Sequence, residues 1–67
     1  MVKKITRAMV TRAENAHFRS ETYPTLVKSH ALSYLYYKQR KKMGMAREYL
    51  TSSAVRMKVK KLEGGKK

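Results

Sequence analysis

The sequence predicts a small all-α domain built from three helices. Apolar residues recur at helical spacing along most of the chain, and only three Gly and one Pro interrupt them. Hydrophobic residues make up 42% of the chain, so material for a compact core is present. We therefore expect a single folded domain over residues 1–63, followed by a flexible basic tail over residues 64–67.

Pro24 and Gly44 divide this domain into segments. Pro24 disfavours a helical conformation at the residue before it and suits a first helical turn, so a helix is expected to begin there. Gly44 follows the cations Lys41 and Lys42. Cations in a last turn with Gly just after them are typical of a helix C-terminus. The expected segments are residues 4–20, 24–43 and 45–63.

The first segment allows two readings. Ile5, Met9 and Ala13 recur on one face of an amphipathic helix that would span the whole segment. Thr11 and Glu14, however, match a capping box. That box would start the helix at residue 12 and leave the residues before it as an arm or a short strand.

The second segment has two apolar surfaces. On a helical wheel Ala31 and Leu35 share one face, whereas Leu32 and Tyr36 fall on the opposite side. Two apolar surfaces on one helix predict either a central position in the fold or a contact with a second copy of the chain, so a homodimer stays open. Residues 33–37 would also suit a β-strand by propensity.

The third segment is split by a polar triplet at residues 51–53. Ala46, Leu50 and Met57 share a helical face, which favours one continuous helix over residues 45–63. The polar triplet is also a plausible turn with a Ser N-cap.

Under this second reading the segment forms two helices, residues 45–50 and 53–63. They have the spacing of a helix-turn-helix unit, and the rhythm of apolar residues over 46–62 is similar to the two-helix part of helix-turn-helix proteins. A third reading makes residues 55–59 an amphipathic strand, because apolar residues and cations alternate there.

The net charge predicts a polyanionic partner. The chain carries 17 Lys and Arg against four Glu, a formal charge of +13. Self-repulsion on that scale opposes compaction, so a polyanion is expected to neutralise it in the working state. Nucleic acid is the leading partner, with DNA favoured over RNA. A ribosome-associated RNA site is the close alternative, and a basic inhibitor or adaptor that docks on an acidic protein surface is a different class.

The expected nucleic-acid-binding residues form two basic blocks in the second half of the chain. Only Glu48 interrupts the positive charge between Lys38 and Lys61, whereas a merely solvated surface would intersperse both signs. Tyr36 lies beside the first block, where an exposed ring could stack on unpaired bases for about 1 to 3 kcal/mol per base. The cations expected to contact phosphates or groove edges are Lys38, Arg40, Lys41, Lys42, Arg47, Arg56, Lys58, Lys60 and Lys61.

No catalytic, metal or cofactor site is expected. The four Glu are scattered, and no Gly-rich phosphate loop or nucleophile motif is present. His17 and His30 have no Cys, Asp or neighbouring His with which to ligate a metal. We expect a binding protein rather than an enzyme.

The absence of Cys mildly favours a reducing compartment such as the cytoplasm. No apolar run approaches the about 20 residues that cross a bilayer, so no membrane partner is expected.

Overall fold

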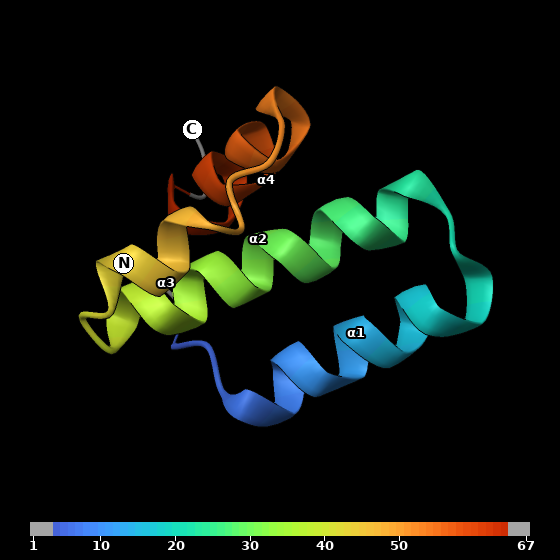
Figure 1. Ribbon diagram of the computed structural model, residues 1–67, viewed down its shortest axis with the longest axis horizontal. Helices are drawn as coiled ribbons and strands as arrows, with labels where there is room; N and C mark the ends of the chain where they lie inside the picture. The colour runs from blue at the N-terminus through green and yellow to red at the C-terminus, as the bar shows by residue number, and fades with distance from the viewer. Residues whose placement is uncertain (1–3, 65–67) are drawn as a thin grey trace.

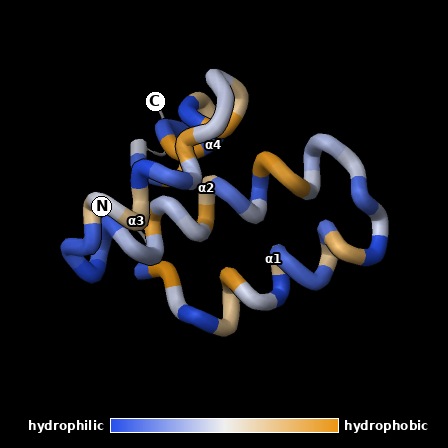
Figure 2. Tube along the Cα trace, viewed as in Figure 1, coloured by the Kyte–Doolittle hydropathy of each residue, from blue (hydrophilic) through white to orange (hydrophobic). Residues whose placement is uncertain are grey.

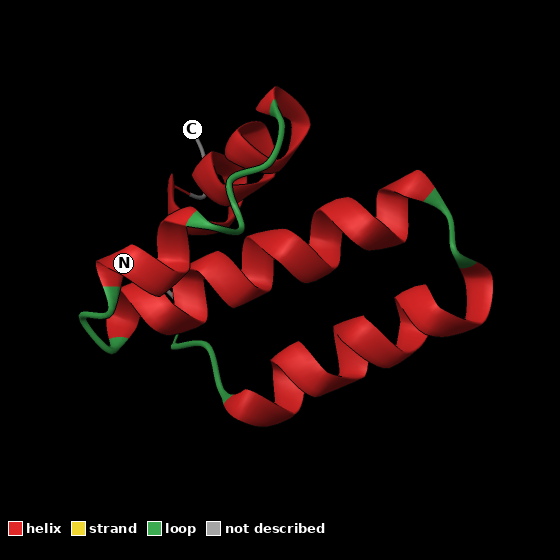
Figure 3. Cartoon of the chain, in the orientation of Figure 1, coloured by secondary structure: helices red, strands yellow, loops and turns green. Residues whose placement is uncertain are grey.

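Four helices make up the part of the chain that the computed structural model describes, residues 4–64 (Figure 1). Figure 3 shows helices and loops but no strand over those residues. The prediction of a small all-helical domain is confirmed, and the strand readings of residues 33–37 and 55–59 are wrong. The helices are α1 (Arg7–Ser20), α2 (Tyr23–Gln39), α3 (Met43–Arg47) and α4 (Ser53–Gly64).

The second helix is the centre of the fold. α1, α3 and α4 each pack on α2 and make no close backbone contact with one another. A hydrogen bond between Tyr23 Oη and Ser52 Oγ (3.1 Å) joins the start of α2 to the start of α4. An ion pair between Lys38 and Glu63 joins their ends, so α4 runs in the same direction as α2. This central position explains the two apolar surfaces that the sequence places on α2.

The core lies between α2 and its three neighbours. Leu35 of α2 is 1% exposed, as expected for a core residue, whereas Leu50 is half-buried. Hydrophilic and hydrophobic positions alternate along α1 and α4 in Figure 2, because each of these helices buries one stripe. The buried hydrophobic residues are Ile5, Val10, Ala13, Ala31, Leu32, Tyr34, Leu35, Ala46, Val55 and Val59.

The first helix begins after Thr6. The Thr6 Oγ1 atom accepts a hydrogen bond from the Met9 backbone N–H (3.3 Å) and so caps the first turn. Ile5, just before this cap, is 2% exposed, and its N–H donates to Gln39 Oε1 (2.8 Å). The reading that starts the helix at residue 12 is therefore wrong. The burial of Ile5 fixes where the chain enters α1, and the pattern formed by Thr11 and Glu14 carries no information about that burial.

The second helix ends earlier than its sequence suggests. α2 stops at Gln39 instead of residue 43, and Gly44 lies inside α3 rather than at a helix end. Lys41 adopts the left-handed conformation (φ 62°) that a helix C-terminus commonly uses. The Lys41 and Lys42 N–H groups donate to the Lys38 and Tyr37 carbonyls (both 2.9 Å). The chain thus leaves α2 through a lysine in the left-handed conformation and not through a glycine.

The third segment forms two helices rather than one. α3 ends at Arg47 and α4 begins at Ser53, so the continuous-helix reading is wrong and the polar triplet is a break. Ser52 Oγ accepts a hydrogen bond from the Val55 N–H (3.4 Å) and caps the first turn of α4. Both helices pack on α2 rather than on each other.

The fourth helix ends at Gly64, the first residue of the predicted tail. Residues 65–67 of that tail lie outside the described residues. Over the described helices, none combines the length and the apolar character that crossing a membrane requires.

Candidate nucleic-acid interface

The fold gathers cations at the end of the molecule where α1 begins and α2 ends. The hydrogen bond between the Ile5 N–H and Gln39 Oε1 (2.8 Å) ties these two chain segments together. The cations on either side of that bond are all exposed. We call this surface the basic end, and it consists of Lys4, Arg7, Arg40, Lys41 and Lys42.

Tyr36 lies close to both arginines of the basic end. The Arg40 Cζ atom is 4.0 Å from the centroid of the Tyr36 ring, and the Arg7 Cζ atom is 6.0 Å from it. Hydrogen bonding to the side chain of Tyr36, and then to that of Tyr37, raises the pKa of the Arg7 guanidinium above its ordinary value. Stacking on an aromatic face restricts a guanidinium while leaving its edge N–H groups free to meet an anion.

The other aromatic rings beside the basic end have structural roles. Tyr37 stacks on Tyr49 with 5.8 Å between centroids and 12° between planes. His30 meets the same Tyr49 ring edge-on at 5.7 Å and hydrogen-bonds to Thr51 through Nδ1 (3.1 Å). Burial raises the pKa of the Tyr49 phenol. These contacts hold the segment after α3 against α2, so the rings of Tyr37 and Tyr49 are used within the fold.

Lys38 belongs to an ion pair rather than to an open basic surface. Its Nζ atom lies 2.6 Å from Glu63 Oε2, and the hydrogen bond to Glu63 raises the pKa of the Lys38 ammonium. This is the one salt bridge recorded within residues 4–64. Lys38 therefore joins the ends of α2 and α4, and its charge is paired with the carboxylate of Glu63.

The fourth helix presents a second basic surface. Val55 and Val59 are buried against the core, which turns the exposed side chains of Arg56 and Lys60 outward. Arg56 and Lys60 are one helical turn apart and line the same shallow hollow. Lys61 is also exposed. We call Arg56, Lys60 and Lys61 the α4 face.

Two further predicted site residues lie apart from these surfaces. Arg47 is exposed at the end of α3, whose course leads away from the basic end. Lys58 is half-buried on α4. The structure thus places the two sequence blocks on different elements, the first at the end of α2 and in the turn after it and the second on α4.

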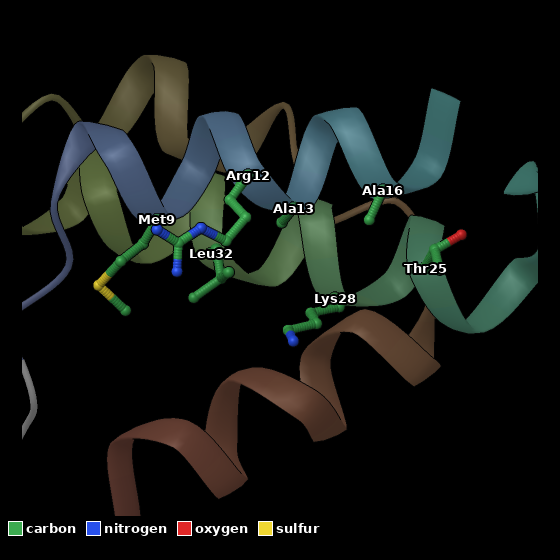
Figure 4. Close-up of a pocket in the computed structure, with 7 residues that line it drawn as sticks. All are labelled: Met9, Arg12, Ala13, Ala16, Thr25, Lys28 and Leu32. Atoms are coloured by element: carbon green, nitrogen blue, oxygen red, sulfur yellow. The ribbon is translucent and has the colours of Figure 1, made fainter. Parts of the chain in front are cut away.

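Sequence reasoning missed several exposed cations on α1 and α2. Arg7 joins the basic end only because α1 packs antiparallel to α2. Arg12 and Lys28, distant in sequence, line one groove between these helices (Figure 4). Each of these residues stands alone in the sequence, so no local charge block marks it.

Comparisons with known proteins identify no relative. No protein-family model, no curated protein and no solved structure matches this chain. Over the described part of the chain, no group of three or more His, Cys, Asp or Glu residues is placed to hold a metal ion.

Proposed function

We propose that this chain is a non-enzymatic nucleic-acid-binding protein that contacts the phosphate backbone of duplex DNA. The observation that carries the proposal is the basic end, where cations from the start of α1 and the end of α2 meet on one exposed surface. Clustered Lys and Arg bind phosphates by releasing the counterions condensed on nucleic acid. The formal charge of +13 adds long-range attraction.

The state of the aromatic rings beside the basic end favours a duplex over a single strand at that surface. A single-strand site needs exposed ring faces on which bases stack. The guanidinium of Arg40 lies over the half-buried ring of Tyr36, and Tyr37 already stacks on Tyr49. Arginines held in this way present charge to a backbone at a low entropic cost, which is the mode of contact that a duplex offers.

The α4 face supplies a second set of phosphate contacts in this proposal. Arg56 and Lys60 project from a helix that the Lys38–Glu63 ion pair and the Val55 and Val59 side chains hold on α2. Charges on a fixed helix lose less conformational entropy when they contact phosphates than charges on a mobile segment do.

A salt-titrated binding assay tests the proposal. Affinity would be measured by fluorescence anisotropy for a DNA duplex, an RNA hairpin and single strands, over a range of salt concentrations. We expect tightest binding to the DNA duplex and a slope of log K against log salt steeper than about −2, since each neutralised phosphate contributes about −0.9. A shallower slope would remove polyanion binding as the main role. Tighter binding to the RNA hairpin would change the proposed substrate.

A pair of double variants locates the contact. Arg7→Gln with Arg40→Gln removes two charges from the basic end and should make the slope shallower by about 1.8. Arg12→Gln with Lys28→Gln removes the same charge from the groove between α1 and α2 and should leave the slope nearly unchanged. Equal effects of both pairs would mean that binding depends on net charge alone, without a defined surface.

A further inference from the structure

We propose that the groove between α1 and α2 is a docking site for an acidic amphipathic helix of a partner protein. The groove has a volume of about 300 Å³, and none of the residues that line it belongs to the basic end (Figure 4). α1 contributes Met9, Arg12, Ala13 and Ala16 to its lining. This inference goes beyond nucleic-acid binding and does not depend on it.

The floor of the groove is apolar and has room for a neighbouring helix. Ala13 and Leu32 are buried at its base, each 6% exposed. Ala16, one turn further along α1, is exposed, and its small side chain allows a second backbone to approach closely. Met9 is half-buried at the other end of the lining, where a flexible thioether adapts to the side chains of a ligand.

The rims of the groove are cationic. Arg12 on α1 and Lys28 on α2 are both exposed, and both line the groove in Figure 4. The lining contains no carboxylate, and neither cation has an ion pair within the described residues. An apolar floor between two cations complements a ligand that carries an apolar stripe flanked by carboxylates.

Charge and polarity select this ligand over two others. The backbone of a DNA duplex presents charged phosphates and no aliphatic side chains that reach into a groove, so it would cover Ala13 and Leu32 poorly. A second copy of this chain carries the same +13 charge and would be repelled. An amphipathic helix with Leu and Glu side chains satisfies both the floor and the rims, in the manner of other helix-in-groove complexes.

The test uses a synthetic peptide as the probe. The peptide is an amphipathic helix with a stripe of Leu flanked by Glu. One control peptide replaces Leu by Ser at unchanged charge, and the other replaces Glu by Gln at unchanged apolarity. We expect the first peptide to bind about tenfold or more tightly than either control, because the groove reads both properties. In NMR spectra of the wild-type protein, the largest shifts should occur at Ala13, Ala16 and Leu32.

Charge reversal supplies a matched pair of variants. Arg12→Glu with Lys28→Glu should weaken peptide binding by about tenfold or more, while Arg7→Glu with Arg40→Glu, an equal change of net charge, should weaken it much less. Equal binding of the Ser control peptide would reduce the interaction to non-specific electrostatics and overturn the proposal. Displacement of the peptide by DNA duplex, with shifts centred on the basic end, would overturn it as well. The wild-type shift map decides the question even if a variant fails to fold.

Discussion

The guanidinium of Arg40 lies over the ring of Tyr36, with 4.0 Å between its Cζ atom and the ring centroid. This contact turns the residue after α2 back onto the last turns of the helix, and it brings Arg40 close to Arg7, which approaches the same ring. Tyr36 therefore orients the arginines of the basic end, a role different from the base stacking that its position in the sequence suggests.

Arg40→Lys is expected to lower duplex affinity several-fold without changing the slope of log K against log salt. Lysine keeps the charge that the slope counts, but it loses the planar stack on Tyr36 that orients the donors. Anisotropy measurements over a salt series separate the two quantities. Lys42→Arg serves as the control and should change neither. If Arg40→Lys binds like the wild-type protein, the stack on Tyr36 has no part in binding.

Glu63→Gln is expected to tighten nucleic-acid binding and to steepen its salt dependence. The substitution releases Lys38 from its 2.6 Å ion pair and adds a free cation beside the α4 face. The Lys38 and Glu63 side chains are 41% and 27% exposed, so the loss of stability should stay below about 1 kcal/mol. Glu21→Gln, which makes the same charge change at the turn between α1 and α2, is the control. Equal gains from both variants would show that only net charge matters.

Stability should fall as the pH drops below about 6.5, because of His30. Burial, and then the neighbouring His17, lower the pKa of the His30 imidazole in the folded protein. As the pH falls through the ordinary pKa of histidine, His30 therefore gains a proton in the unfolded chain before it does so in the folded protein. The free energy of unfolding decreases as a result. Thermal unfolding followed by circular dichroism between pH 8 and pH 5 would measure this, with the pH range set about the ordinary value.

The matched variant for this effect is His30→Asn, which keeps a polar group near Thr51 but cannot titrate. It should flatten the dependence of the melting temperature on pH. An unchanged dependence in His30→Asn would assign the effect to other groups.

Lys41→Gly is expected to stabilise the fold by about 0.5 to 1 kcal/mol. Lys41 holds a left-handed conformation (φ 62°) that glycine adopts without steric cost. Lys42→Gly is the control, because Lys42 has a negative φ (−107°) that glycine does not favour. Glycine there only increases the conformational entropy of the unfolded chain, so this variant should be less stable than the wild-type protein. Urea unfolding of both variants checks the difference. A loss of stability in Lys41→Gly would mean that its side chain, rather than its backbone, matters at this turn.

Local patterns in the sequence determined the helical class and several of the element boundaries. Pro24 lies in the first turn of α2, as its fixed φ and missing N–H predict. The polar residues at 51–53 separate α3 from α4, because Ser side chains compete for backbone N–H groups and so favour caps. Both signals depend only on neighbouring residues, which is why they can be read without a fold.

Only the tertiary structure decided which cations act together. The Lys41 and Lys42 cations before Gly44 predict a helix end at residue 43, yet α2 ends at Gln39, where Lys41 takes the left-handed conformation and the Lys41 and Lys42 N–H groups bond to carbonyls of the last turn. The packing of the helices on α2 brings Arg7 to the basic end. It also pairs Lys38 with Glu63, which is 25 residues away in the sequence. Side-chain pairing between distant segments depends on how the helices dock on α2, and periodicity along one helix carries no information about that docking.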